Sequence, residues 1–344
     1  MDSYAATLAR MPALQGAIDE HPERYRVLTG ERPTGRLHLG HYFGTILERV
    51  RLQTNGVETF VILADYQVIT DRDSAGDVRS AVYEAVLDYL AAGLDPTSTT
   101  IFAHSTVPAL NQLLVPFLSL VTEAELHRNP TVKSELAASG RTLSGLLLTY
   151  PVHQAADILF CKGNLVPVGK DNLPHVEMTR TIARRFNERY GSVFPEPAAL
   201  VTATPELPGL DGRKMSKSYG NAIALGMTAD ETAAAIRRAP TDSERAITYD
   251  PTNRPGVSGL LATAAVVLNR TPEEIANEVG SAGAGALKRL TTEAVNEFLA
   301  DHRARRAALT IADAAAVLRE GNERAESIAN DTLDEVRAAM GMTY

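Results

Sequence analysis

The sequence is poor in cysteine, has no tryptophan, contains no long apolar segment and carries no excess of positive charge. The single cysteine among 344 residues, Cys161, excludes an intramolecular disulfide framework and any multi-cysteine metal site, and it is typical of a reducing cytoplasm. The N-terminus has no basic flank followed by an apolar core, and apolar runs such as 60–64 are too short to cross a membrane. We therefore expect a cytoplasmic protein that does not bind a membrane.

The charge balance is acidic. Lys and Arg number 34 against 42 Asp and Glu, which gives a formal net charge of −8. No global basic field is therefore available to hold nucleic acid non-specifically, which argues against a DNA partner and requires any polyanion to be bound locally. An acidic metabolic enzyme is the simplest class that agrees with this charge.

Short apolar segments alternate with helical patterns over the first two thirds of the chain. The predicted strands are 25–29, 58–64, 99–103 and 164–169, and the predicted helices are 1–24, 39–53, 74–94, 109–138, 151–160 and 173–190. This alternation predicts an α/β fold in which helices cover both faces of a parallel sheet, with ligands at the carboxyl ends of the strands. After about residue 225 the strand signals cease, so an all-helical unit is expected there.

The loop after the first predicted strand carries the strongest local signal. It contains His38 and His41, three residues apart at a helix start, with Gly40 between them. Two imidazoles in this arrangement can face an oxyanion, and the glycine admits a flat ring against the backbone, so we expect phosphate here. The alternative is a surface loop whose histidines cap the helix, because a short His-x-x-His pattern has low specificity.

A second polar loop, at 212–218, reads Gly-Arg-Lys-Met-Ser-Lys-Ser. Lys214 and Lys217 are three residues apart with hydroxyl groups beside them, which suits a mobile clamp on a triphosphate, since each ammonium is a point charge with three donors. A solvated basic turn is the alternative. No Walker pattern is present, so P-loop chemistry is disfavoured.

Together, residues 38–41 (His-Leu-Gly-His) and 214–218 (Lys-Met-Ser-Lys-Ser) resemble the HIGH and KMSKS signatures of class I aminoacyl-tRNA synthetases. They occur in the expected order and are separated by most of a catalytic domain. The resemblance implies a Rossmann-like catalytic domain over 1–224 and a helical anticodon-binding domain over 225–344.

Segments outside the two signatures are similar to tryptophanyl-tRNA synthetases, namely 148–151, 155–159, 165–169, 177–180, 185–187, 241–244 and 255–258. The resemblance runs from about Tyr25 to the C-terminus and distinguishes the chain from the tyrosyl enzymes. It implies a homodimer that activates L-tryptophan with ATP and transfers it to tRNA(Trp). A tyrosyl enzyme, an adenylate-forming nucleotidyltransferase that charges no tRNA, and a catalytically weak paralogue stay open as alternatives.

The chemistry of indole adds a physical reason for tryptophan. Indole is a large apolar surface with one N–H donor, so its site needs an apolar slot and one buried acceptor. Asp157 is the expected acceptor, and its spacing from His153 and Gln154 lets all three face one ligand from a helix. Tyr150 and Gln67 are the expected contacts to the rest of the amino acid. The alternative for Asp157 is a carboxylate on a helix surface.

The resemblance also assigns an ATP site, with Mg²⁺ bound through the phosphates and no metal held by the protein alone. Asp171 is the expected acceptor for a ribose hydroxyl, and Leu207 is an expected backbone contact to adenine. The lysines of the second loop would hold the β and γ phosphates. The expected ATP-binding residues are Arg32, Pro33, Thr34, Gly40, His41, Gly169, Lys170, Asp171, Leu207, Lys214, Met215, Ser216, Lys217 and Ser218, and the expected catalytic residues are Lys214, Lys217, His38 and His41.

The chain departs from the commoner bacterial form of the family at several of these positions. That form has Gln, Asn and Met where this chain has Arg32, His41 and Gln154, which indicates a diverged second bacterial type. In the helical unit, basic residues are candidates for the tRNA backbone, and the helices at 109–120 are candidates for a subunit contact. The basic candidates are Arg237, Arg238, Arg245, Lys288, Arg289, Arg303, Arg305 and Arg306.

Overall fold

The computed structural model describes residues 4–70, 76–140, 142–201, 207–216 and 219–344. Its centre is a five-stranded sheet in the order β3-β2-β1-β4-β5, and all neighbouring pairs are parallel. The strands are β1 (Arg26–Glu31), β2 (Glu58–Leu63), β3 (Thr99–Ala103), β4 (Leu165–Val168) and β5 (Ala198–Val201). The predicted parallel sheet is confirmed. The sequence pattern missed β5, because a four-residue edge strand that begins with two alanines has a single β-branched residue, Val201, to mark it.

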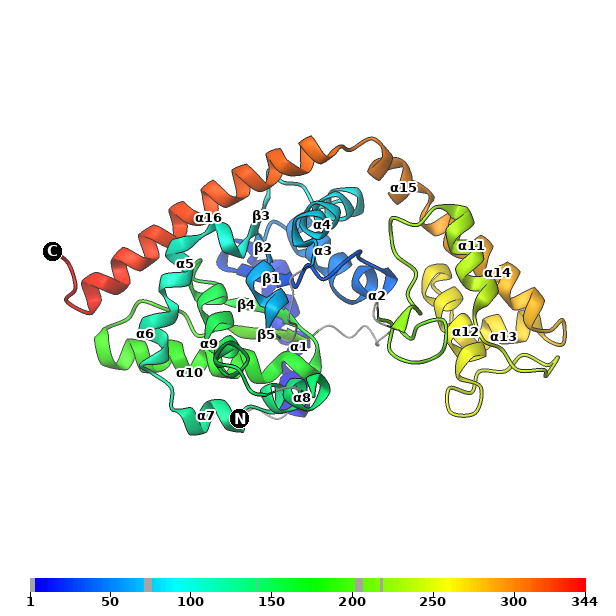
Figure 1. Cartoon of the computed structure of the whole chain (residues 1–344), viewed down its shortest axis with the longest axis horizontal. Coiled ribbons are helices and arrows are strands. Elements are labelled where there is room, and N and C mark those ends of the chain that lie inside the picture. The colour runs from blue at the N-terminus through cyan, green and yellow to red at the C-terminus, as the bar shows by residue number, and fades with distance from the viewer. Residues whose placement is uncertain (1–3, 71–75, 141, 202–206, 217–218) are drawn as a thin grey trace.

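Helices cover both faces of the sheet (Figure 1). On one face, α9 (Gly145–Leu159) and α10 (Leu173–Tyr190) form a core with Phe60 and Phe102. On the other face, the core joins Val61 and Ile101 to α4 (Val78–Ala92), with α3 (Leu47–Thr54) beside it. Because strands buried on both faces cannot alternate polar and apolar residues, they show the continuous apolar runs seen in the sequence.

The remaining helices frame this core. Those before residue 225 are α1 (Tyr4–Glu20), α2 (Leu39–His41), α5 (Pro108–Gln112), α6 (Leu114–Leu118), α7 (Glu123–Arg128) and α8 (Pro130–Ser139). Those after it are α11 (Ala229–Arg238), α12 (Pro255–Leu268), α13 (Pro272–Val279), α14 (Ala284–Phe298), α15 (Ala300–Ala307) and α16 (Ile311–Ala339). In the described part of the chain, no helix combines the length and the apolar character needed to cross a membrane.

The helices after residue 225 lie in two places. Figure 1 shows α11 to α14 as a lobe beside the sheet domain, whereas α16 returns and runs along β3 and α5. Gly321 allows this close approach, because a Cβ atom there would lie 1.9 Å from the carbonyl oxygen of Ile101. The side chain of Asn322 then accepts a hydrogen bond from the backbone N–H of Ala103 at 2.9 Å. α16 therefore covers the exposed edge of β3, which would otherwise present unpaired backbone groups.

Candidate active site

The two signature segments, far apart in the sequence, meet at the carboxyl edge of the sheet. The backbone N–H of Leu39 donates to the oxygen of Ile223 at 3.0 Å, and that of Leu225 donates to the oxygen of Leu37 at 2.9 Å. A Cβ atom on Gly40 would lie 3.5 Å from the Sδ atom of Met215, so the two loops also pack against each other. Main-chain pairing therefore joins the HIGH-like segment to the stretch that follows the lysine loop.

The described part of the lysine loop is held by one buried amide. The side-chain oxygen of Asn221 accepts from the backbone N–H of Ser216 at 2.9 Å, and its nitrogen donates to the backbone oxygen of Lys214 at 3.1 Å and to Asp211 at 2.7 Å. The backbone of Lys214 is thus fixed while its side chain is exposed. Leu207, just before the loop, is buried.

The HIGH-like histidines lie together at the start of α2. His38 is buried, and its backbone N–H donates to Nδ1 of His41 at 3.2 Å, with the ring centroids 3.7 Å apart. The histidines therefore do cap the helix, as the alternative interpretation expected. The surface-loop part of that interpretation is wrong for His38, which is buried. A Cβ atom on Gly40 would lie 3.0 Å from the ring of His38, so glycine gives that ring its room.

A buried charge network supports this loop from below. The carboxylate of Glu31, at the end of β1, accepts from Arg49 at 2.9 Å and from the hydroxyl of Tyr89, and it faces Nε2 of His41 at 3.5 Å. Burial raises the pKa of Glu31, but His41, Arg49 and Tyr89 outweigh it and lower that pKa to about 2. Sequence reasoning missed this network. The only signal was a charged residue, Arg49, on a helix that faces the core.

The expected nucleotide contacts on the other strand ends lie at the same edge. Gly169 follows β4 directly, and a Cβ atom on it would lie 2.8 Å from a carboxylate oxygen of Asp171, which is exposed. Arg32 lies 3.7 Å from Glu135 of α8, and Pro33 and Thr34 continue the same turn after β1. Lys217, Ser218 and the side chain of Lys170 lie outside the described residues.

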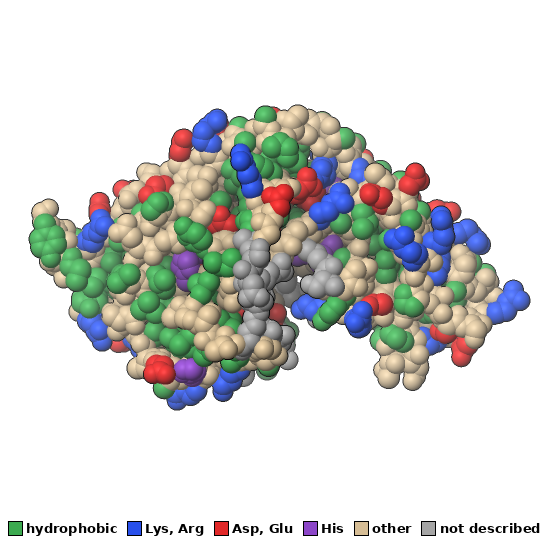
Figure 2. Space-filling model, in the orientation of Figure 1, with side chains coloured by type: hydrophobic (Ala, Val, Ile, Leu, Met, Phe, Trp, Pro, Cys, Tyr) green, Lys and Arg blue, Asp and Glu red, His purple; other side chains and the backbone are tan. Residues whose placement is uncertain are grey.

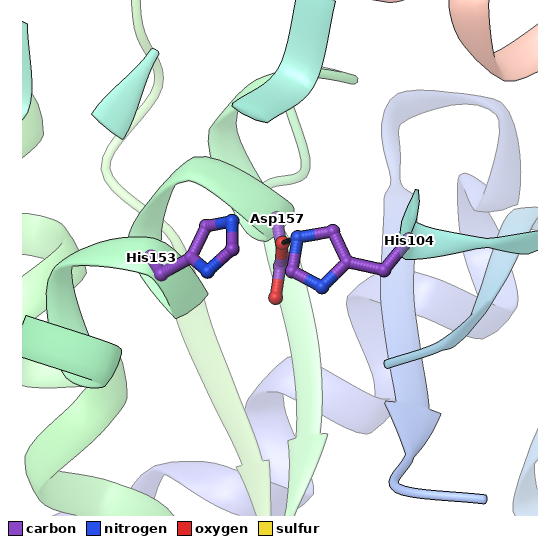
Figure 3. Close-up of side chains that lie close together, drawn as sticks. All are labelled: His104, His153 and Asp157. Carbon is purple, nitrogen blue, oxygen red and sulfur yellow. Dashed lines mark ion pairs between the residues drawn. The ribbon is translucent and has the colours of Figure 1, made fainter. Parts of the chain in front are cut away.

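The expected amino-acid contacts gather at the ends of β2 and β3. Asp157 is 4% exposed, so the interpretation as a helix-surface carboxylate is wrong. Figure 3 shows it close to two imidazole rings, that of His153 from the same helix and that of His104, the first residue after β3. Nε2 of His104 lies 3.0 Å from Oδ1 of Asp157. Gln67 is buried, and its amide nitrogen lies 2.8 Å from Nδ1 of His153.

Tyr150 lies on α9, one turn before His153. Its side chain is buried, its hydroxyl lies 3.3 Å from Nε2 of His175, and burial followed by the charge of Glu135 raises its pKa. Gln154, on the same helix, is half-buried. Tyr150 interacts electrostatically with Glu135 and Arg32.

The predicted amino-acid contacts therefore fall into two groups. His153 lies between Gln67 and Asp157 and brings them together, whereas Tyr150 belongs with Arg32 and Glu135. His104 was not predicted, because a single histidine after a strand shows no pattern.

This fold and this pair of loops define a class of protein. Residues 20–300 match the family of class I tRNA synthetases for W and Y. The chain therefore belongs to this family.

Relatives and solved structures narrow the assignment. A tryptophan–tRNA ligase of Treponema pallidum is 42% identical over 92% of this chain and 97% of its own, and one of Clostridium longisporum is 39% identical over the same shares. Tryptophanyl-tRNA synthetase from Campylobacter jejuni, solved with ADP and tryptophan, superposes with a TM-score of 0.81 at 30% identity, over 92% of this chain and 99% of its own. Within its family, the chain groups with the tryptophanyl-tRNA synthetases.

Proposed function

We propose that this site performs the tryptophan–tRNA ligase reaction. The carboxylate of L-tryptophan attacks the α-phosphorus of ATP, and the bond between that phosphorus and the oxygen that bridges to the β-phosphate breaks. The products are tryptophanyl-adenylate and pyrophosphate. The terminal ribose of tRNA(Trp) then takes the acyl group and releases AMP. The observation that carries the proposal is that the HIGH-like segment pairs with the stretch after the lysine loop and approaches Met215 of that loop, while the carboxylate of Asp157 is buried beside the end of β3.

The nucleotide side stabilises phosphoryl charge. Activation needs little acid–base chemistry, so fixed positive charge near the phosphates supplies most of the catalysis. We assign that charge to Lys214 and Lys217, with His38 and His41 at the start of α2. Mg²⁺ enters with ATP on its phosphates. The lysine loop also contains a carboxylate, Asp211, which would repel phosphate. Asp211 accepts hydrogen bonds from Asn221 and Arg213, so its negative charge is compensated within the loop.

The amino-acid side recognises the indole. Its single N–H needs a buried acceptor, and an unpaired donor would cost about 1–3 kcal/mol. We assign that acceptor to Asp157 and the contacts to the rest of tryptophan to Gln67, Tyr150 and Gln154. Tyrosine is rejected because its hydroxyl lies at a different depth from the indole nitrogen and leaves the acceptor unmatched.

The tRNA partner is assigned to the lobe of α11 to α14. Half of the eight basic candidates of the helical unit donate hydrogen bonds within the protein: Lys288 of α14, and Arg303, Arg305 and Arg306 of α15. Examples are Lys288, which donates to two backbone oxygens, and Arg306, which pairs with Asp88 at 2.6 Å and so joins α15 to α4. Four other candidates, Arg237, Arg238, Arg245 and Arg289, are exposed, as is Arg305, whose Nε donates to the backbone oxygen of Ala91. Figure 2 shows Lys and Arg side chains along the outer rim of this lobe, which suits a local contact to a polyanion.

The subunit contact and the compartment complete the proposal. Val115 of α6 is a large aliphatic side chain that is 72% exposed. It lies in the helical stretch expected to join two copies, so we assign the homodimer contact to α5 and α6. A reducing cytoplasm suits the buried thiol of Cys161, whose pKa burial raises to about 12.

The activity is tested by ATP–pyrophosphate exchange with tryptophan and with tyrosine, followed by charging of tRNA(Trp). We expect exchange and charging with tryptophan and at least about a hundredfold lower kcat/KM with tyrosine. Comparable exchange with tyrosine would favour the tyrosyl alternative. Exchange without charging would favour a nucleotidyltransferase that uses no tRNA.

A further inference from the structure

His104 and Asp157 form a buried pair whose hydrogen bonding is incomplete. His104 is 0% exposed, and among the described residues neither of its ring nitrogens has an aligned hydrogen-bond partner; the same holds for Oδ1 of Asp157. The 3.0 Å between Nε2 and Oδ1 is close enough for an ion pair. Burying a charge is costly unless it is paired, so each group depends on the other.

His153, whose ring centroid lies 4.1 Å from that of His104, is in a different state. The amide nitrogen of Gln67 donates to its Nδ1 at 2.8 Å, and its Nε2 donates to the side-chain oxygen of Asn111 at 2.8 Å. Both nitrogens are therefore used by the neutral ring. Burial lowers the pKa of His153 to about 4, which agrees with a ring that stays neutral.

The positive charge on the amino-acid side of the site is therefore carried by His104 and not by His153. The groups that face it are Asp157 and His153 from α9, together with Asp65 and the ring of Tyr66, which follow β2. Burial lowers the pKa of His104, but the negative charges of Asp157 and Asp65 outweigh it, so that pKa is raised from its ordinary value.

A metal ion is the other occupant that these side chains suggest. One ligand atom each from His104, His153 and Asp157 lies within 4.8 Å of the others, and two imidazoles with a carboxylate are donors that zinc accepts. The lone pair of His153 is already used by Gln67, however, which leaves one imidazole and one carboxylate. The hydrogen bonding thus favours a protein-internal ion pair over a metal centre.

We propose that His104 is a positioning residue for tryptophan specificity: its imidazolium holds one oxygen of Asp157 so that the other oxygen stays charged and faces the indole N–H. The inference rests on the proposed role of Asp157 as the indole acceptor. A carboxylate that keeps its charge in a dry pocket is a stronger acceptor than a neutral group. Because the imidazolium and the carboxylate together carry no net charge, the pair also avoids the cost of an isolated buried charge.

The test uses an analogue of tryptophan that lacks only the donor. In β-(benzothiophen-3-yl)alanine a sulfur atom replaces the indole N–H. The KM values for tryptophan, for this analogue and for ATP are measured by pyrophosphate exchange in wild type, His104→Leu and His104→Gln. The Gln variant is the matched control, because its amide nitrogen can reach the place of Nε2 and donate to Asp157. Exchange with the analogue reports that each variant folds.

We expect the preference for tryptophan over the analogue to fall about tenfold in His104→Leu, the scale of one hydrogen bond to a charged partner, while the KM for ATP stays unchanged. His104→Gln should keep most of the preference. In wild type the preference should decline as the pH rises through the raised pKa of His104, and in His104→Gln it should not. An unchanged preference in His104→Leu would overturn the proposal.

Two further arms separate the possible failures. If Asp157→Asn also leaves the preference intact, the acceptor itself is misassigned. If Asp157→Asn abolishes the preference and His104→Leu does not, only the role of His104 is wrong. The measurements are repeated with a chelator and with added Zn²⁺, and we expect no effect from either. Competition between Zn²⁺ and tryptophan would favour the metal site and contradict the ion pair.

Discussion

The two sides of the site are built in different ways. On the nucleotide side, segments 37–39 and 223–225 hold each other through main-chain hydrogen bonds, and the side chain of Lys214, on the loop before the second segment, is exposed. On the amino-acid side, buried side chains hold one another: Gln67 contacts His153, and His104 contacts Asp157. Main-chain pairing tolerates substitution of exposed side chains, whereas a buried polar network couples all its members. Mutations should therefore give separable kinetic signatures on the two sides.

The largest effect is expected on the nucleotide side. Lys214→Ala should lower kcat/KM for pyrophosphate exchange by about 10²–10³, the scale for removing one charged donor from a developing transition state. The affinity for tryptophan, measured by equilibrium titration, should not change. Arg213→Ala in the same loop is the control, because the Arg213 side chain pairs with Asp211 and stacks on Tyr219. An equal loss of tryptophan affinity in Lys214→Ala would erase the distinction between the two sides.

A second test concerns the support of the amino-acid side. Gly321→Ala would push α16 away from β3, the strand that leads into His104, because of the contact with Ile101. We expect a loss of about 1–3 kcal/mol in the free energy of unfolding in urea, as for other overpacked sites. Gly16→Ala in α1 is the control, since nothing lies within 4 Å of the added Cβ. That control should instead gain about 0.5–1 kcal/mol.

Any kinetic change in Gly321→Ala should appear mainly in the KM for tryptophan. An equal rise in the KM for ATP would show that the sheet edge transmits strain to both sides alike.

The amino-acid side itself gives a smaller and more selective effect. Asp157→Asn keeps the shape of the side chain and removes its charge, so the KM for tryptophan should rise about tenfold. The KM for ATP should stay within about twofold, because separate segments hold the nucleotide. Parallel changes in the two KM values would mean that Asp157 supports the whole site rather than the indole.

The fold was largely readable from the sequence, and the reason is periodicity. Apolar runs such as 58–64 and 99–103 become buried strands wherever helices cover both faces of a sheet. The short strand β5 carried no such run and was missed. The place of α16 was not readable either, because its contact with β3 depends on a glycine, Gly321, whose partner lies more than two hundred residues away.

The site was readable only where residues are neighbours in the chain. Asp157 and Gln154 share a helix, so their spacing placed them together. His104 joins Asp157 only through the neighbouring ends of folded elements, and Glu31 meets Arg49 in the same way. Buried ion pairs of this kind leave no periodic pattern, because each partner lies on a different element.

The prediction most local to one side chain is a pH dependence of stability near Tyr150. Burial lowers the pKa of His175 from 6.5 to about 4, so at pH values between these the unfolded chain binds a proton that the native protein does not. The free energy of unfolding should therefore fall as the pH falls through this window, by up to about 1.4 kcal/mol per pH unit from this group. In His175→Gln this part of the slope should vanish, and above pH 7 the two curves should run parallel. Identical slopes in acid would show that His175 takes up its proton in the folded state.

The recognition of the indole can be observed directly, because the chain contains no tryptophan of its own. In a nitrogen-15 NMR spectrum of the protein with tryptophan labelled at the indole nitrogen, the only indole signal comes from the ligand. We predict a single bound N–H resonance, shifted downfield by its carboxylate acceptor and slow to exchange with water, which moves toward the position of the free amino acid in Asp157→Asn. A bound resonance that exchanges as fast as free tryptophan, or one that Asp157→Asn leaves in place, would contradict the assignment of Asp157 as the indole acceptor.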